Sequence, residues 1–536
     1  MKKFLTLTIS LFLVASAYSQ ELIKVRIDDF SGGQNSYDLA DSIDVNQGEL
    51  VQNASQEKRG RLEKRKGQAL FADDLGNTAF RGVGDFYPDS TTSYVLAASG
   101  TDIVRSTSAG ASWTVVNTGK ALTAGYNTEF LQADNLLFIF NGEDNTSWYD
   151  GSTFVLPTSV GTVYPASPPK ATTGAWVANY LFLAGNPTYP DWVYFSNNLE
   201  PREFTANNVI KINTGDGQEI VRIEPFRENE IIVYKQRSVY MLDITGSTPL
   251  ADWAYKPISR TIGCAAERSV VNIGNDHWFL SSEPIAVRSL IRSSFDKILL
   301  DRASDPIQDI FDGTGETTIN VSSIDVACAI LHDNKYILGI PTGVSTVNDY
   351  VVVYDFLTKS WTTIDGWYPA EWIVYENDLY YIDANDGRMI ECFTGTTGDM
   401  YEGPVVTGSS EPSVAITFDW RSKNISFDNP ENYKMLDALD LELGASGDYD
   451  ADVYIEMDDG GWQRVGDMNL AGGAVTLPVS LPFTLSASGV ARETFQLQQY
   501  GEFKNIKIRV VQDGLSELCD LHRATIFAYM KPWRRE

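Results

Sequence analysis

Histidine and cysteine are scarce in this chain of 536 residues, which has three histidines and four cysteines. The cysteines stand singly at Cys264, Cys328, Cys392 and Cys519, with no CxxC pair. This density is far below that of a disulfide scaffold, so we expect buried free thiols. So few histidines leave little material for metal or acid–base sites. We therefore expect no metal and no cofactor.

Basic residues are also few, because 42 lysines and arginines face 71 aspartates and glutamates, for a formal charge of −29. A protein that grips DNA by neutralising phosphates has the opposite balance. Strong acidity predicts solubility and repulsion of polyanions. A net negative charge suits the wall of a channel past which DNA must slide without sticking. It is equally consistent with a large protein whose charge only keeps it soluble.

Long apolar runs are nearly absent, and the one clear run lies at Phe4–Ala15. Lys2 and Lys3 precede it and Ala17-Tyr18-Ser19 follows, which is typical of a secretory signal cut before Gln20. The run is too short for a spanning helix, so we expect no membrane insertion of the mature form. A virion protein assembled in the cytoplasm is not exported, which leaves two locations open: a virion tail, or secretion.

Short β-like runs recur along the chain, and aromatic residues make up 12% of it, which favours an all-β fold. Six runs follow an Asn/Asp turn, and their marker residues are spaced 43 to 59 apart: Asn135, Asn179, Asn229, Asn275, Asn334 and Asn377. Propeller blades repeat at roughly 40–50 residues. Asn and Asp tolerate left-handed turns, so we expect each marker to open a hairpin before an inner strand. With an earlier run at Tyr94–Ala97, the pattern predicts a β-propeller of six to eight blades.

The pattern changes towards the C-terminus. Asp450–Met457 alternates, Asp458–Gly461 reads as a turn, and Lys504–Val511 is a further long strand, which together predict a β-sandwich-like domain. A segment rich in Gly, Thr, Ser and Pro at Gly395–Pro412 reads as the linker. The expected organisation is a signal-like segment (1–20), an N-terminal arm (21–80), a β-propeller (81–410) and the C-terminal domain (411–536).

Several motifs occur in a fixed order. Phe30–Asn35 reads Phe-Ser-Gly-Gly-Gln-Asn, Asn53 follows, and Gly60–Gly67 reads Gly-Arg-Leu-Glu-Lys-Arg-Lys-Gly. Later pieces are Phe138–Asp144, Trp192–Phe204 and Asp333–Trp361. This ordered set, over roughly residues 22–440, resembles the phage tail nozzle or packaged-DNA stabilisation proteins, the tail tubular protein B-like β-propellers of short-tailed phages. The signal-like segment departs from that family's pattern.

The resemblance implies a structural virion protein without catalytic residues. Its subunits form a ring, commonly of six copies, that retains packaged DNA and conducts it during ejection. The implied partners are other copies of the chain, portal or adaptor proteins above, tail fibre or other tail proteins, and transiently double-stranded DNA. The alternative is a secreted or cell-surface β-propeller that binds glycan or protein. A propeller enzyme with an unrecognised site is a third option.

One basic cluster stands out in the acidic chain. Its members are Lys58, Arg59, Arg61, Lys64, Arg65 and Lys66. It reads as a solvated loop, a DNA contact or an interface to an acidic neighbour. Because sticking to DNA would oppose ejection, we favour a protein interface over a DNA contact. The terminal Lys531–Glu536 is a second, weaker candidate of this kind.

Three turn-like motifs are better explained by structure than by chemistry. Ser106–Trp113 resembles the Asp-box turn of sialidase-like propellers, which lies far from catalysis. Asp383–Gly387 and Asp312–Glu316 contain acidic residues but lack the spacing of a calcium loop. No Gly-rich phosphate loop, HExxH or GxSxG motif occurs. We therefore predict no catalytic residue and no enzymatic activity.

Overall fold

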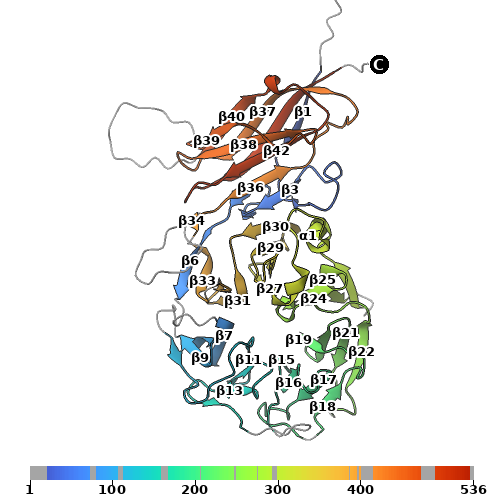
Figure 1. Cartoon of the computed structure of the whole chain (residues 1–536), viewed down its shortest axis with the longest axis vertical. Coiled ribbons are helices and arrows are strands. Elements are labelled where there is room, and N and C mark those ends of the chain that lie inside the picture. The colour runs from blue at the N-terminus through green and yellow to red at the C-terminus, as the bar shows by residue number, and fades with distance from the viewer. Residues whose placement is uncertain are drawn as a thin grey trace, which may run out of the picture.

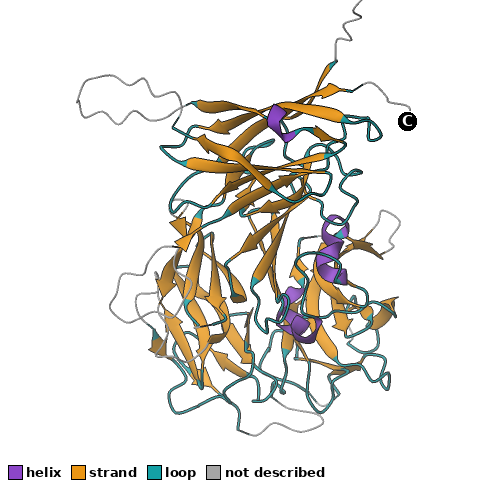
Figure 2. Ribbon diagram, turned by 45° about the horizontal axis from the view of Figure 1, so that its top comes forward, coloured by secondary structure: helices purple, strands orange, loops and turns teal. Residues whose placement is uncertain are grey.

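The chain folds into two β bodies, a propeller and a sandwich, which lie one above the other in Figure 1. The computed structural model describes residues 21–72, 80–106, 113–158, 167–205, 207–246, 249–274, 276–292, 298–385, 387–394, 398–399, 414–471 and 489–531. Strands run through both bodies, and the few helical segments are short, with one in the sandwich and the others in the propeller (Figure 2). The predicted all-β class, with a propeller and a C-terminal sandwich, is confirmed.

Seven four-stranded units surround the propeller axis in the described part of the chain, within the predicted range of six to eight. Six of them are separate sheets, and β27–β30 continues into a larger sheet. The first four units are β7–β10 (Phe80–Asp89, Thr92–Ser99, Asp102–Ser106, Thr114–Val115), β11–β14 (Glu129–Ala133, Leu136–Phe140, Ser147–Tyr149, Phe154–Val155), β15–β18 (Thr173–Val177, Tyr180–Ala184, Trp192–Phe195, Val209–Lys211) and β19–β22 (Ile220–Arg227, Glu230–Lys235, Val239–Asp243, Ala254–Ser259).

The remaining three units complete the ring. They are β23–β26 (Val271–Asn272, Asp276–Ser282, Ile285–Arg292, Ile298–Arg302), β27–β30 (Cys328–His332, Lys335–Ile340, Tyr350–Asp355, Ser360–Asp365) and β31–β33 (Pro369–Tyr375, Asp378–Asp383, Met389–Thr394) with β6 (Gly67–Ala72). Strand β6 pairs antiparallel with β33, so the last unit takes its outer strand from the N-terminal part of the chain. The first strand of each unit packs against the first strands of its neighbours, and β7 contacts both β11 and β31, which closes the ring.

The turn markers mostly behave as their chemistry predicts. Positive φ angles occur at Asp333 and Asn334 (45° and 57°) and at Glu376 and Asn377 (52° and 72°), as a tight left-handed hairpin turn requires. Each described marker follows the innermost strand of its unit and precedes the second strand, rather than opening the hairpin before an inner strand. Asn275 lies outside the described residues.

The sandwich consists of two packed sheets. One contains β1 (Leu22–Ile27), β4 (Ala54–Ser55), β5 (Leu62–Lys64), β37 (Lys434–Gly444), β40 (Val490–Gln496), β41 (Glu502–Phe503) and β43 (Asp520–Met530). The other contains β2 (Gly33–Gln34), β3 (Gln47–Gln52), β36 (Phe418–Ser422), β38 (Asp450–Met457), β39 (Gln463–Asn469) and β42 (Ile506–Gln512). Alternate residues of β37 and β42 are buried between the sheets, as the alternating sequence predicts.

Strand β3 joins the two bodies. It pairs in parallel with β30 of the propeller through Gln52 and Thr363, and antiparallel with β36 of the sandwich. One ten-stranded sheet therefore runs from β27 to β39. Before β6, the N-terminal arm belongs to the sandwich, because β1 pairs with β43 and β5 also pairs with β43.

Helical segments are short. They are η1 (Glu267–Ser269), η2 (Asp305–Ile307), α1 (Gln308–Asp312), η3 (Val321–Val326) and η4 (Gln498–Tyr500). No helix in the described ranges has the length and hydropathy needed to cross a membrane. Most of the expected linker lies outside the described residues, and β34 (Gly398–Asp399) pairs with β35 (Val414–Ala415) beside it.

All four cysteines are buried and free, as predicted.

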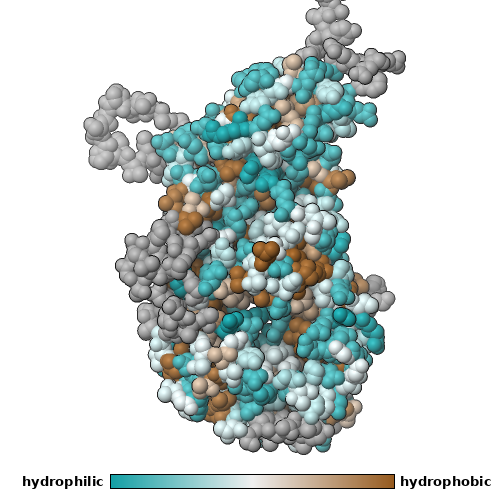
Figure 3. All heavy atoms as spheres, viewed as in Figure 1, coloured by the Kyte–Doolittle hydropathy of each residue, from teal (hydrophilic) through white to brown (hydrophobic). Residues whose placement is uncertain are grey.

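The surface carries more polar residues over the sandwich face of Figure 3, whereas hydrophobic residues gather in patches across the middle of the molecule. Part of the exposed apolar surface lies on the loop between β2 and β3, where Tyr37, Leu39 and Val45 are all exposed.

Candidate functional site

The basic cluster predicted from the sequence is divided by the fold. Lys64 and Arg65 are buried, so they cannot belong to a surface that meets another molecule. Lys64 ends β5 and donates from Nζ to the Gln512 side chain at 2.7 Å and to the Gly514 carbonyl at 3.0 Å. Reading the cluster as one exposed loop fails for these two residues, because short sequence spacing does not reveal which side of a strand faces the core.

Arg65 belongs to the joint between propeller and sandwich. Its Nε donates to Asn53 Oδ1 at 3.0 Å, and its guanidinium lies over the Trp367 ring, 4.9 Å from the centroid. Asn53 Nδ2 donates to Asp365 Oδ1 at 2.5 Å and to the Thr417 carbonyl at 2.8 Å. One buried asparagine thus links the arm, the end of β30 and the start of the sandwich.

The Phe30–Asn35 motif lies at the same joint. Gly33 has φ +63°, and a Cβ there would approach the Trp361 carbonyl oxygen to 2.5 Å, so only glycine fits without rearrangement. Gln34 is buried, and its Oε1 accepts from the Val51 amide at 3.1 Å and from the Thr363 hydroxyl at 3.4 Å. The three N-terminal pieces of the family resemblance, Phe30–Asn35, Asn53 and Gly60–Gly67, therefore contribute residues that hold the two bodies together.

The other four members of the basic cluster remain at the surface of the sandwich. Lys58 pairs with Glu63 at 2.7 Å, Arg61 lies 3.6 Å from Asp520, and Lys66 lies 3.9 Å from Glu57. Arg59 is also exposed. Exposed pairs of this kind contribute little to stability, so Lys58, Arg61 and Lys66 can exchange their partners for those of another molecule.

The turn motifs have structural roles where the structure describes them. The Asp383 carboxylate accepts from the Asn385 amide at 2.7 Å in the β32–β33 turn, although Asp386 lies outside the described residues. At the second motif, Gly313 caps α1 in the left-handed region, and Glu316 pairs with Arg421 at 3.0 Å.

The remaining sequence candidates lie mostly outside the described part of the chain. Of the Asp-box-like motif only Ser106 and Trp113 are described, and of the terminal basic stretch only Lys531, which pairs with Glu502. Within the described ranges no group of three or more His, Cys, Asp or Glu side chains is arranged to hold a metal ion.

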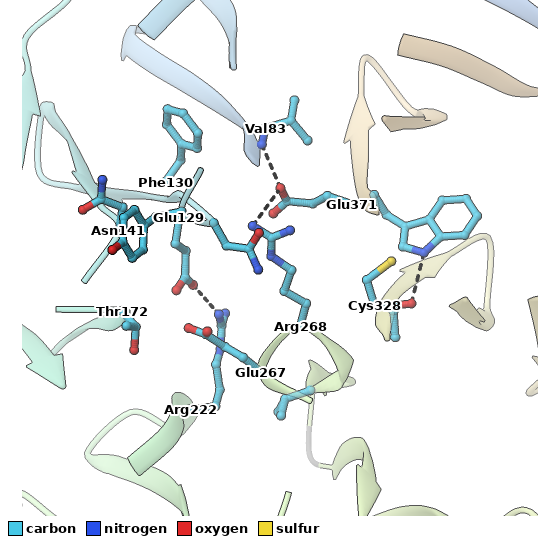
Figure 4. Close-up of a pocket in the computed structure, with 15 residues that line it drawn as sticks. Val83, Glu129, Phe130, Asn141, Thr172, Arg222, Glu267, Arg268, Cys328 and Glu371 are labelled. Carbon is cyan, nitrogen blue, oxygen red and sulfur yellow. Dashed lines mark hydrogen bonds and ion pairs between the residues drawn. The ribbon is translucent and has the colours of Figure 1, made fainter. Parts of the chain in front are cut away.

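A cavity of about 400 Å³ lies on the propeller axis. The innermost strands and η1 line it, and its acidic and basic lining residues are Glu129 of β11, Arg222 of β19, Glu267 and Arg268 of η1, and Glu371 of β31. Figure 4 shows these side chains converging from different units of the ring towards one another. Sequence reasoning did not identify this cluster.

Two ion-pair networks cross the cavity. Arg222 pairs with Glu129 and, at 3.1 Å, with Glu224. Arg268 lies 3.5 Å from the Glu371 carboxylate, which also accepts from the Val83 amide at 2.9 Å (Figure 4). The side chains of both networks are only 17–18% exposed, so solvent screens these charges much less than at the surface.

Burial shifts the titration of the cavity carboxyls. Desolvation, followed by the neighbouring Glu129 carboxylate, raises the pKa of Glu267 to about 8. Desolvation likewise raises the pKa of Glu371 to about 7, against the lowering effect of Arg268. Burial alone would lower the pKa of Arg222, but the carboxylates of Glu129, Glu224 and Glu267 outweigh it and raise that pKa. Both glutamic acids therefore exchange protons near neutral pH.

The cavity is better equipped to bind a charged group than to supply a nucleophile. Cys328 also lines it, but burial raises the pKa of this thiol well above its ordinary value, so the reactive thiolate is scarce. The thiol donates to the Pro369 carbonyl at 3.4 Å.

A weak signal for this cluster exists in the sequence. Glu129, Arg222 and Glu371 stand six or seven residues before the markers Asn135, Asn229 and Asn377. A one-residue difference in offset normally places a side chain on the opposite face of a strand. Arg222 still meets Glu129 because the pairing of β19 with β20 shifts register between Ile220 and Arg222 and between Pro225 and Arg227, which the sequence does not reveal.

The chain matches no family model, and no curated protein matches its sequence. Its fold is similar to that of solved β-propellers. YCF48 from Cyanidioschyzon merolae is 13% identical, with a TM-score of 0.38, over 61% of this chain and 98% of that one.

Two further solved structures are similar in the same way. The extracellular domain of a putative hybrid two-component system from B. thetaiotaomicron is 11% identical, with a TM-score of 0.42, over 62% of this chain and 40% of that one. PorZ, a bacterial surface component of the type-IX secretion system of Porphyromonas gingivalis, is 10% identical, with a TM-score of 0.40, over 80% of this chain and 60% of that one. These likenesses concern the fold alone.

Proposed function

We propose that this chain is a structural subunit of a phage tail channel, which assembles with copies of itself into a ring that retains packaged DNA and conducts it during ejection. The observation that carries the proposal is the buried joint of Gly33, Gln34, Asn53 and Arg65, because it is built from the motifs that resemble the tail nozzle family. A subunit that withstands the force of packaged DNA needs its two bodies held rigidly together. The mechanism is passive and uses no catalytic residue.

The charge of the chain suits such a channel. A formal charge of −29 repels a passing polyanion, so DNA would move along the ring without adhering. The proposed partners are copies of the chain, most simply six, with portal or adaptor proteins above and tail fibre or other tail proteins beside them. The proposed location is the virion tail.

Two surface features support self-association. The exposed basic residues Lys58, Arg59, Arg61 and Lys66 stand out on an acidic molecule and suit an acidic face of a neighbouring copy. Leu39, 80% exposed, projects from a loop that is fixed to the body, because the Tyr37 amide donates to the Pro306 carbonyl at 3.1 Å. A fixed apolar side chain in water is a ready anchor for an interface.

Charge reversal tests this proposal. We expect the double variant Lys58→Glu/Arg59→Glu to shift the full-length protein from rings towards monomers, measured by native mass spectrometry and sedimentation velocity. The matched control is Arg237→Glu, since Lys58 and Arg237 are 64% and 68% exposed and each has one carboxylate partner. A wild-type protein that is monomeric at every concentration and in purified virions would rule out the ring.

A secreted or cell-surface β-propeller that binds glycan or protein is the second candidate. The signal-like segment at residues 1–20 and the charged axial cavity favour it. Intact-mass measurement separates the two: a chain beginning at Gln20 and found outside the host cell supports secretion, whereas an uncut chain in virions supports the tail.

A further inference from the structure

The axial cavity contains carboxylate oxygens that lack partners. Glu129 Oε2 and Glu267 Oε1 are buried and accept no hydrogen bond in the described part of the chain. A buried charged acceptor left unpaired costs free energy, because the hydration that it loses is not replaced. Glu129 and Glu267 both line this cavity, and Figure 4 shows their side chains directed towards each other beside Arg222. The cavity therefore offers two acceptors to a donor that the described residues do not supply.

The net charge of the groups around the cavity favours a hydrogen-bond donor that is positively charged. Among the described residues that line it or pair with its arginines, four are glutamates and two are arginines: Glu129, Glu224, Glu267, Glu371, Arg222 and Arg268. The cavity carries an excess of two negative charges when all of these groups are ionised, which for Glu267 requires a pH above its pKa of about 8. A cation that enters lowers this repulsion, whereas an anion raises it.

Neutral lining residues indicate an organic cation rather than a metal ion. Tyr126, 45% exposed, lies at the cavity, and Asn127, Asn141 and Thr172 also line it. An aromatic ring beside a carboxylate suits an ammonium group through cation–π attraction. A calcium ion takes six to eight oxygen ligands, and no group of three or more acidic, Cys or His side chains is arranged for one in the described ranges.

We propose that the axial cavity binds an alkylammonium group, R–NH₃⁺, of a small amine or of a lysine side chain. Its three N–H donors pair with Glu129 Oε2, Glu267 Oε1 and a neutral acceptor of the lining, while its alkyl chain lies against Tyr126 and Phe130. A cavity of about 400 Å³ accommodates such a chain and is far larger than a bare ion. This site is independent of whether the chain forms a ring.

Binding can be measured on the full-length protein with n-butylammonium as the probe and n-butanol as the neutral probe of similar size. We expect saturable binding of the amine at pH 8 by isothermal titration calorimetry, with at least tenfold weaker binding of the alcohol. Glu267→Gln is expected to weaken the amine at least tenfold. The exposed Glu283→Gln, on a carboxylate that is 68% exposed, is the matched control and is expected to bind as the wild type does.

A second variant, Tyr126→Ala, tests the site in case Glu267→Gln fails to fold. Tyr126→Ala changes a side chain at the rim of the cavity and is expected to weaken the amine without lowering the thermal midpoint. A lysine-containing tripeptide amide, compared with its norleucine counterpart, distinguishes a side-chain source from a free amine. The proposal is overturned if butylammonium binds no better than butanol, if Glu267→Gln and Tyr126→Ala both bind it normally, or if only calcium binds.

Discussion

Arg65 and Glu267 show how individual residues take their roles from burial. Arg65 is a charged side chain in a motif rich in Lys and Arg, yet it is buried and bonded to Asn53. Glu267 stands in an ordinary stretch of sequence, yet the ring places it beside Glu129 on the axis. The chemistry of each side chain was visible in the sequence, whereas the side of the strand on which it lies was not.

Replacement of Arg65 by Met is expected to lower the free energy of unfolding by about 3 kcal/mol, because it leaves the partners of a buried charge unsatisfied. Urea denaturation of the full-length chain measures this loss. Lys58→Met, at an exposed position of the same cluster, is expected to stay within about 0.5 kcal/mol of the wild type. Equal effects of the two variants would contradict the burial of Arg65.

Glu267 is expected to make stability depend on pH. Its pKa of about 8 in the folded protein lies above the value of roughly 4.3 in an unfolded chain, so the folded state binds the proton more tightly. The contribution of this group is therefore complete below pH 4.3 and is lost as the pH rises towards 8, with a slope of at most about 1.4 kcal/mol per unit. Relative to the wild type, Glu267→Gln should gain stability between pH 5 and pH 8 in urea denaturation. A difference that stays constant with pH would refute this.

Elements differ in how much of them the sequence predicts. The hairpin turns were found because Asn and Asp at positions such as Asn334 and Asn377 need only their own backbone preference for positive φ. The joint was not found, because β3 pairs in parallel with β30 across some 300 residues of sequence, and no local pattern specifies such pairing. The axial cluster was missed for the same reason, since its members meet only when the ring closes.

Gly33 and Gly343 allow the cost of a positive φ angle to be distinguished from the cost of a steric clash within a strand or turn. Gly33 and Gly343 have φ angles of +63° and +58°, but only Gly33 has atoms within reach of an added Cβ. We expect Gly343→Ala to cost about 1 kcal/mol and Gly33→Ala to cost about 2 kcal/mol more, because the Trp361 carbonyl must move. Chemical denaturation of both variants gives the comparison, and equal losses would mean that the joint is not tightly packed.

At the scale of the whole molecule, the continuous sheet makes the propeller and the sandwich one cooperative unit. The N-terminal arm contributes β1 and β5 to the sandwich and β6 to the last unit of the propeller, so neither body is complete without it. The domain boundaries expected from the sequence treated this arm as a separate segment. Its role depends on pairing with strands near the other end of the chain, which composition does not reveal.

Differential scanning calorimetry is expected to show one transition for the wild type, because unfolding of either body removes strands from the other. Asn53→Ala is expected to split it into two transitions, since this asparagine links the arm to both bodies. Two resolved transitions in the wild-type protein would contradict the coupling.

Ring assembly can be observed by negative-stain electron microscopy of the purified full-length protein. We expect closed rings with a central channel, formed by copies of the uncut chain. Single particles of monomer size at every concentration, with no rings in purified virions, would contradict it and leave the secreted binding protein as the better explanation.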